Sequence, residues 1–223
     1  MHGMLPFQRE FLELAIARDA LRLGEFTLKS GRVSPYFFDA GRLNGGRDFA
    51  ILGRCYAAAL AHAGLAFDML FGPAYKGIPL ATALAIAWSE RCDENLPVAY
   101  NRKEAKTHGE GGLLVGAPVA GRVLIVDDVI TAGTAIREAL ALIETSGAQT
   151  VGVVVALDRE ERGHNALSAV QELQRDCSVT VVAIARFTDL IELVGTNRAL
   201  EVHEPRLRAY RDRYGSQPGL LEP

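Results

Sequence analysis

Short apolar runs alternate with longer amphipathic segments along most of the chain. The runs VLIV at 123–126, VGVVVA at 151–156 and VTVVAI at 179–184 are rich in β-branched residues and show no polar alternation. Such runs are typical of strands that helices cover on both faces, as in a parallel sheet. Because segments with helical periodicity separate the runs, the pattern predicts an α/β fold with a mostly parallel, doubly wound sheet.

The alternating pattern begins at Arg47. It predicts strands at 67–71, 97–100, 122–126, 150–156 and 179–184, and helices at 49–63, 77–89, 133–145, 165–175, 188–194 and 206–214. Ahead of it, apolar residues at helical spacing predict one helix over 7–23 that ends at Gly24. Two extended runs, 25–29 and 36–39, flank a Ser-Gly-Arg turn and predict a hairpin-like lobe.

Nothing in the 223 residues marks a boundary between separate domains. There is no internal repeat and no linker rich in glycine, serine or proline, and the length is enough to bury a sizeable core. We therefore expect one domain, with an N-terminal hood over roughly 1–45, a core over 46–214 and a loose tail over 215–223.

The composition excludes some classes of partner. The net charge is −3 and the pI is near 6.0, so no overall field attracts nucleic acid or an anionic membrane. The most apolar stretch, 57–70, contains His62, Gly64 and Asp68 and is too short to span a bilayer. The three cysteines have no metal-ligand spacing, which predicts buried thiols in a reducing compartment. We expect a cytoplasmic protein without a nucleic-acid or membrane partner.

Ligands of doubly wound sheets lie beyond the carboxyl ends of the strands. That rule selects four segments of this chain, 72–77, 101–112, 127–133 and 158–163, which we expect to be loops. Each contains glycines, charged residues or both, so the candidate chemistry is concentrated where the fold predicts a ligand.

The most informative of these segments comes after the run VLIV. Asp127 and Asp128 can accept hydrogen bonds from two sugar hydroxyls, and carboxylates are strong acceptors. The turn Thr131–Thr134 then opens a helix and can present backbone N–H groups to a phosphate, while Gly133 allows close approach. An acidic strand end beside a helix cap is the plain alternative. The whole stretch VLIVDDVITAGTAIREAL resembles the phosphoribosyl pyrophosphate (PRPP) motif of type I phosphoribosyltransferases and implies their fold.

Two further segments resemble parts of the same family. Gly72–Gly77, with Lys76, is similar to its pyrophosphate loop, where a helix N-terminus and a cation meet an anion. Segment 102–112 carries Arg102, Lys103, Lys106 and His108 and closely resembles the mobile lid of orotate phosphoribosyltransferases. In that family the lid enters the active site of a partner subunit, so the resemblance implies a homodimer with shared sites.

The remaining features indicate the base. Phe37 and Phe38 can wall a flat ring and Lys29 can meet an anion, although adjacent phenylalanines alone more often belong to a core. Arg159, after a central strand, can bind a carboxylate bidentately, and orotate carries one. These positions resemble the base site of orotate phosphoribosyltransferases. The acidic pair Glu160 and Glu161 has no expected role.

The resemblance implies transfer of ribose 5-phosphate from PRPP to orotate, giving orotidine 5′-monophosphate and pyrophosphate in pyrimidine synthesis. Mg²⁺ is the implied cofactor, held mainly by PRPP and water rather than by the protein. It implies PRPP binding by Lys29, Tyr75, Lys76, Arg102, Lys103, Lys106, His108, Asp127, Asp128, Val129, Ile130, Thr131, Ala132, Gly133, Thr134 and Ala135. It implies orotate binding by Lys29, Phe37, Phe38, Thr131 and Arg159, and catalytic roles for Lys103, Lys106, His108 and Asp128.

Two alternatives stay open at this point. A phosphoribosyltransferase for adenine, hypoxanthine or uracil would share the PRPP motif, but it would not need the features that suit an anionic ring. A regulator of the same fold would bind PRPP or nucleic acid without catalysis. It should lack the lid cations or carry a basic arm or an added DNA-binding domain.

Overall fold

The computed structural model of the protein describes residues 3–28, 30–106, 112–131, 133–163 and 166–216, with only the backbone of 105 and 106. Its helices are α1 Pro6–Ala17, α2 Gly46–Ala63, α3 Gly77–Cys92, α4 Thr134–Thr145, α5 Ala169–Cys177, α6 Phe187–Thr196 and α7 Glu204–Tyr214, with short 3₁₀ turns at Ala40–Arg42 and Glu201–His203. Its strands are β1 Leu21–Thr27, β2 Val33–Phe38, β3 Met69–Gly72, β4 Val98–Lys106, β5 Gly112–Gly116, β6 Arg122–Val129, β7 Gln149–Asp158 and β8 Thr180–Arg186.

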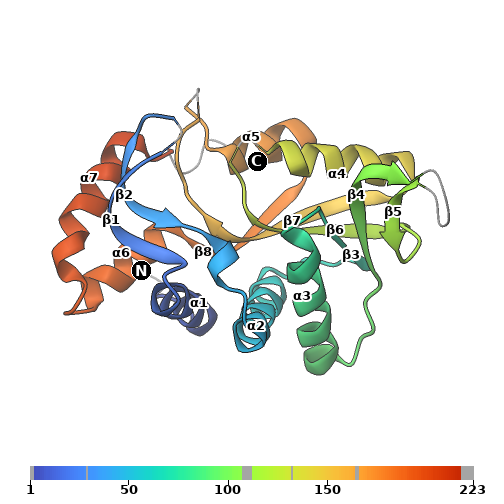
Figure 1. Cartoon of the computed structure of the whole chain (residues 1–223), viewed down its shortest axis with the longest axis horizontal. Coiled ribbons are helices and arrows are strands. Elements are labelled where there is room, and N and C mark those ends of the chain that lie inside the picture. The colour runs from blue at the N-terminus through green and yellow to red at the C-terminus, as the bar shows by residue number, and fades with distance from the viewer. Residues whose placement is uncertain (1–2, 29, 107–111, 132, 164–165, 217–223) are drawn as a thin grey trace.

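Six strands form one sheet in the order β5-β4-β3-β6-β7-β8. All neighbouring pairs are parallel except β5, which pairs antiparallel with β4 at one edge. Figure 1 shows α1, α2 and α3 below this sheet and α4 and α5 above it. The predicted α/β fold with a mostly parallel, doubly wound sheet is confirmed.

Apolar residues on both faces of each central strand explain this layering. On β6, Leu124 and Val126 belong to the core that includes residues of α1, α2 and α3. Val123 and Ile125 belong to a second core with residues of α4 and α5. Successive strand residues point to opposite faces, so a run without polar alternation must be covered twice.

The predicted hairpin exists, but the predicted helix over 7–23 is wrong over its last six residues, 18–23. α1 ends at Ala17, and Asp19 takes a left-handed conformation with φ 55°. β1 then starts at Leu21, which pairs with Phe38 of β2. Leu21 and Leu23 are two residues apart, a spacing that suits a strand, and their cross-strand pairing with β2 decides the outcome.

The segment 101–112 is not simply a loop as predicted. β4 continues to Lys106, and Gly112–Gly116 forms β5, a strand that the sequence did not predict. β5 is only five residues long with glycine at each end, so it carries little strand signal. A side chain at Gly116 would lie 2.4 Å from the carbonyl oxygen of Val98, so close pairing of the two strands requires glycine there.

Smaller expectations also need correction. Asp127 and Asp128 belong to β6 rather than to the loop after it, and α5 begins at Ala169 with Ser168 as its cap. Of the three free cysteines, Cys55 is buried, Cys177 is half-buried and Cys92 is exposed, so the prediction of three buried thiols is wrong. At the start of the predicted tail, Ser216 N donates to the carbonyl oxygen of Glu160 at 2.8 Å.

Candidate functional site

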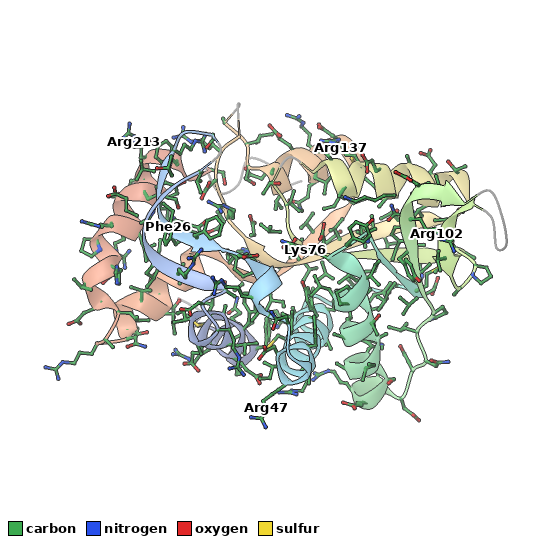
Figure 2. The ribbon with its side chains drawn as sticks, viewed as in Figure 1. Phe26, Arg47, Lys76, Arg102, Arg137 and Arg213 are labelled. Atoms are coloured by element: carbon green, nitrogen blue, oxygen red, sulfur yellow. The ribbon has the colours of Figure 1, made fainter. Side chains whose placement is uncertain are left out.

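The parallel order of the sheet brings the candidate segments together. β4, β3, β6 and β7 are neighbours, so the segments after them start at the same edge of the sheet. Figure 2 shows Lys76 at this edge, in the middle of the molecule, between Phe26 of the hood and Arg102 of β4. Segments 72–77, 101–106, 127–133 and 158–163 therefore meet as the sequence predicts.

The carboxylates at the end of β6 are held in a buried setting. Asp128 is only 5% exposed, and its backbone N–H donates to Oδ1 of Asp127 at 2.9 Å. The Tyr56 hydroxyl of α2 donates to the carbonyl oxygen of Asp127 at 2.7 Å. Burial and the charge of Asp128 raise the pKa of Asp127 to about 7. Two close carboxylates in a poorly hydrated place are suited to a ligand that brings donors or positive charge.

Lys76 is bound to one member of this pair. Its Nζ atom lies 2.6 Å from Oδ2 of Asp128. Burial acts to lower the pKa of Lys76, but the hydrogen bond and charge of Asp128 outweigh it and the pKa is raised. The structure thus brings together two residues with separate predicted roles, one for pyrophosphate and one for ribose.

The turn before α4 has the features of an anion site. Gly133 has φ 70°, a left-handed conformation that favours glycine, and it directly precedes the helix. Within its described residues, no side chain caps this helix and no acidic residue lies in its first turn. Thr131, Thr134 and Ala135 are exposed. Among the described side chains, none accepts from the first N–H groups of α4, which is the situation at many phosphate sites.

The turn from β3 into α3 is packed too tightly for side chains at its glycines. A Cβ atom at Gly72 would lie 2.4 Å from the Gly77 carbonyl oxygen, and one at Gly77 would lie 2.7 Å from that of Val126. The Ala74–Tyr75 peptide is cis, and the Ala74 N–H donates to Oδ1 of Asn101 at 3.0 Å. β4 therefore supports this turn directly through Asn101, a residue that no sequence motif indicated.

Two of the predicted lid cations are described. Lys103 Nζ lies 4.8 Å from the centre of the Tyr75 ring, which is 67% exposed. Arg102 Nη1 donates to the Gly112 carbonyl oxygen at 3.2 Å and so links β4 to β5. The predicted site residues Lys29, His108 and Ala132, and the side chain of Lys106, lie outside the described residues.

The two hood phenylalanines do not form one wall, which corrects the prediction. Adjacent strand residues point to opposite faces, so Phe38 enters the core. The centre of its ring lies 6.1 Å from the centre of the Phe11 ring. Phe37 lies on the other face of β2. The centre of its ring is 5.7 Å from the centre of the Phe26 ring and 5.2 Å from the Arg22 guanidinium carbon. Only the Phe37 ring is free of the core, and Phe38 can reach a ligand only through its backbone.

Arg159, at the end of β7, has a close partner for which the sequence predicted no role. Its Nη2 atom donates to Oε1 of Glu161 at 2.7 Å, and its guanidinium lies 4.9 Å from the centre of the Tyr36 ring. Glu161, a residue without an expected role, is therefore in direct contact with a predicted site residue. The two-residue alternation along β2 could have indicated that Tyr36 points into the protein, because Ser34 and Phe38 lie on the same buried face.

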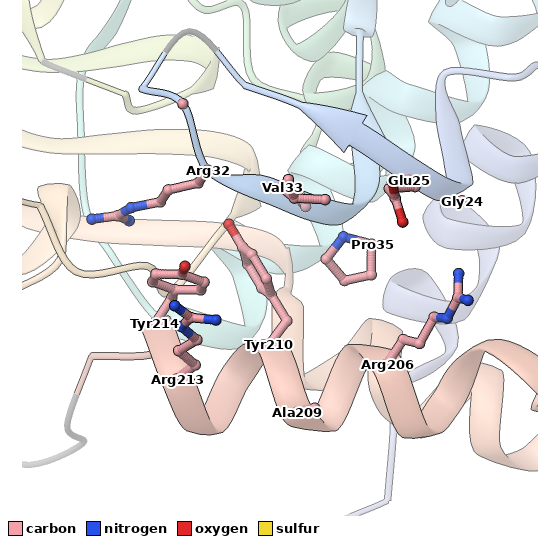
Figure 3. A pocket seen from close by; sticks show the side chains of 12 residues that line it. Gly24, Glu25, Arg32, Val33, Pro35, Arg206, Ala209, Tyr210, Arg213 and Tyr214 are labelled. Atoms are coloured by element: carbon pink, nitrogen blue, oxygen red, sulfur yellow. The ribbon is translucent and has the colours of Figure 1, made fainter.

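An open groove of about 450 Å³ lies elsewhere, between the β1–β2 hairpin and α7. Figure 3 shows Tyr210 and Arg213 of α7 on one side and Val33 and Pro35 of β2 on the other. None of the predicted site residues that the structure describes lines it. We therefore define the candidate site by the residues at the carboxyl edge of the sheet and not by this groove.

We expect Asp127→Asn to stabilise the substrate-free protein in a pH-dependent way. Because the pKa of Asp127 is raised to about 7, the native protein keeps a proton there that the unfolded chain has lost. Stability therefore falls as the pH rises from about 4 to about 7. Asparagine does not titrate, so the Asp127→Asn protein does not lose this stability as the pH rises. The melting temperature at pH 8 should rise by about 4–8 °C, equivalent to about 2 kcal/mol, and the rise at pH 5 should be less than half as large.

Asp68→Asn is the matched control for this experiment. Asp68 is exposed and pairs with Arg122 at 2.7 Å, which lowers its pKa to about 2. It is charged at both pH values, so its replacement should change the melting temperature equally at pH 5 and pH 8. A pH-independent effect of Asp127→Asn would contradict the raised pKa.

Two further properties of the described residues bear on ligands and location. No group of three or more His, Cys, Asp or Glu side chains there is arranged to hold a metal ion. Among the described helices, none has the length and apolar character needed to cross a membrane.

The chain is similar to known proteins over nearly all of its length. Residues 44–185 match the family model of the phosphoribosyl transferase domain. The chain is 57% identical to an orotate phosphoribosyltransferase of Pseudomonas putida over 95% of this chain and 100% of the relative. The crystal structure of the enzyme of that name from Francisella tularensis superposes with a TM-score of 0.83 at 39% identity, covering 92% of this chain and 99% of the other.

A third similarity concerns a complex. The orotate phosphoribosyltransferase of Mycobacterium tuberculosis in complex with PRPP superposes with a TM-score of 0.63 at 26% identity, covering 83% of this chain and 99% of the other.

Proposed function

The chain belongs to the orotate phosphoribosyltransferases, and from this we propose that the carboxyl edge of its sheet is the active site. The predicted type I phosphoribosyltransferase fold and the predicted enzyme class are confirmed by these relatives. The enzyme transfers the phosphoribosyl group from PRPP to orotate, a step of pyrimidine biosynthesis. The roles of individual residues in this step are our proposal.

The observation that carries the proposal is the junction of β6 and α4. Buried Asp128 and half-buried Asp127 lie near the end of β6. The N-terminus of α4, which no described side chain caps, follows within a few residues. We assign the two carboxylates to the ribose hydroxyls and the turn from Thr131 to Thr134, with the backbone around it, to the 5-phosphate. This arrangement fixes the sugar while its anomeric carbon develops positive charge.

We assign the leaving pyrophosphate to the cations of the neighbouring segments. Lys76 stands in the tight turn before α3, and Lys103 lies beside Tyr75 of the same turn. Lys106 and His108 complete this set by resemblance to the family's lid. Cations that meet the departing group stabilise the charge that grows on it, and a closed lid excludes water from the reacting carbon.

Mg²⁺ fits this site as a cofactor with few protein ligands. Asp127 and Asp128 supply hard oxygen atoms, but Asp128 is already bound to Lys76. Magnesium retains water and accepts substrate oxygens readily, so PRPP and water would provide most of its ligands. When bound, it would neutralise charge on the pyrophosphate.

We assign the base to the space beside the hood, next to Phe37 and Arg159, with Lys29 and Thr131 by resemblance. Orotate carries a carboxylate, and a buried arginine can bind it through two parallel hydrogen bonds. Phe38 would contribute only through its backbone, because its ring belongs to the core.

We also propose a homodimer in which the lid of each subunit serves its partner's site. The resemblance of 102–112 to the family's lid supports this. Light scattering coupled to size-exclusion chromatography should give twice the subunit mass of 24.1 kDa at assay concentration. A monomer that is fully active would contradict shared sites. Three free thiols suit a reducing compartment, which supports the cytoplasm as the location.

The direct test of base selectivity is the loss of orotate absorbance on addition of PRPP and Mg²⁺. Adenine, hypoxanthine and uracil are run in parallel, with product chromatography. We expect turnover of orotate alone. Turnover of another base would leave the assignment of the PRPP site intact and contradict the assignment of Arg159. PRPP binding without any turnover would favour a regulatory protein of the same fold.

A further inference from the structure

A largely buried hydrogen-bonded group, made of Tyr36, Arg159 and Glu161, joins the hood to the end of β7. Oε1 of Glu161 accepts from Arg159 Nη2 at 2.7 Å, from Arg159 Nε at 3.2 Å and from the Tyr36 hydroxyl at 3.1 Å. The side chains of Arg159 and Glu161 are only 15% and 13% exposed. Charge-assisted hydrogen bonds away from water hold their partners firmly, because a buried charge that loses its partner is strongly disfavoured.

This contact uses only one edge of the guanidinium group. Nε and Nη2 form the side edge, while Nη1 and the second hydrogen of Nη2 form the end fork. Within the described part of the chain, Glu161 is the only side chain or carbonyl group that accepts a hydrogen bond from Arg159. The end fork carries two parallel donors, which is the geometry that binds a planar carboxylate bidentately.

Tyr36 fixes the same group from the hood. Its ring lies 4.9 Å from the Arg159 guanidinium and stacks on Phe187 with a centroid distance of 4.7 Å. Burial raises the pKa of Tyr36 well above its usual range, so its hydroxyl keeps the proton that it donates to Glu161. The arginine is therefore held by a ring on one face and by a carboxylate along one edge.

The backbone around Glu161 is also held in place. Glu160 has φ 50°, an uncommon left-handed conformation for a residue other than glycine. Its carboxylate accepts from the Thr188 N–H at 2.9 Å, and its carbonyl oxygen accepts from Ser216 N at 2.8 Å. These contacts with α6 and with the segment after α7 hold the turn from which Glu161 reaches Arg159.

We infer that Glu161, together with Tyr36, is a positioning residue for orotate recognition: it occupies the side edge of Arg159 and so presents the end fork to the substrate carboxylate. The inference rests on the proposed role of Arg159 in binding orotate. Charge alone would have the opposite effect, because a carboxylate beside an anion site repels the anion. The sign of the effect on orotate binding therefore distinguishes positioning from simple repulsion.

The experiment compares Glu161→Gln and Tyr36→Phe in the full-length protein, with the KM of each substrate measured separately. Glutamine keeps the size and one acceptor but loses the charge-assisted bonds, so we expect the KM for orotate to rise about tenfold. Tyr36→Phe removes one donor and keeps the ring, so we expect a rise of about threefold. The KM for PRPP should stay within about twofold in both variants.

Glu204→Gln is the matched control. It weakens another Glu–Arg pair, Glu204 with Arg208 at 2.6 Å, on α7. We expect both KM values of this variant to equal those of the unsubstituted enzyme.

The KM values of Glu161→Gln and Arg159→Ala together test the inference. An orotate KM in Glu161→Gln that is unchanged or lower overturns the inference, and so does an equal rise in both KM values. Arg159→Ala is measured in parallel: if it leaves the orotate KM unchanged, the proposed role of Arg159 fails as well. If Arg159→Ala raises the orotate KM and Glu161→Gln does not, only the positioning role fails. If Glu161→Gln does not fold, Tyr36→Phe decides by the same criterion.

Discussion

We expect Asp128→Asn to lower kcat/KM for PRPP by about 10²- to 10³-fold. The substitution removes two charge-assisted contacts at once, the proposed bond to a ribose hydroxyl and the 2.6 Å contact with Lys76. Each such bond contributes about 1.5–3 kcal/mol, but asparagine keeps an oxygen acceptor at both contacts, so we expect the lower part of the sum, about 3–4 kcal/mol. Initial rates at varied PRPP and saturating orotate measure it.

The fold should tolerate this change, because asparagine keeps the shape of Asp128 and an oxygen acceptor for Lys76. Asp68→Asn provides the control, since it also neutralises an aspartate in an ion pair, with Arg122 at 2.7 Å, outside the proposed site. We expect less than a twofold change there. If Asp128→Asn retained kcat/KM within about threefold, the assignment of this carboxylate to the sugar would be wrong.

The second large effect is expected on the binding of the orotate base. Arg159→Ala should raise the KM for orotate by about 10²-fold and leave the KM for PRPP nearly unchanged, because a bidentate carboxylate contact is lost. Arg137→Ala is a suitable control, since Arg137 pairs with Asp176 at 3.1 Å on the surface. Steady-state kinetics with each substrate varied in turn measure the effect.

Arg159→Ala also leaves the largely buried carboxylate of Glu161 without its cation, which destabilises the protein. Arg159→Lys avoids this problem, because it keeps a positive charge beside Glu161 but lacks the planar fork. We expect an orotate KM between those of Arg159→Ala and the unsubstituted enzyme. A parallel rise in the KM values of both substrates would show that Arg159 acts on the whole site and not on the base carboxylate.

The sequence alone determined the sheet and the segments at the ends of its strands. Unbroken β-branched runs such as 151–156 require cover on both faces, and this requirement led to the doubly wound fold. The motif from Asp127 to Thr134 carries its chemistry within a few neighbouring residues, so it was recognisable without coordinates. The division into hood, core and tail remains a prediction.

Tertiary structure decided what local patterns could not. Leu21 forms a strand because Phe38 pairs with it, and Gly112–Gly116 forms a strand because β4 is beside it. Phe38 enters the core because strand neighbours point to opposite faces. The ion pairs of Asp128 with Lys76 and of Arg159 with Glu161, and the contact of Arg159 with the Tyr36 ring, depend on side-chain directions and burial. These are set by packing between distant segments, so a single sequence identifies the charged groups but not their partners.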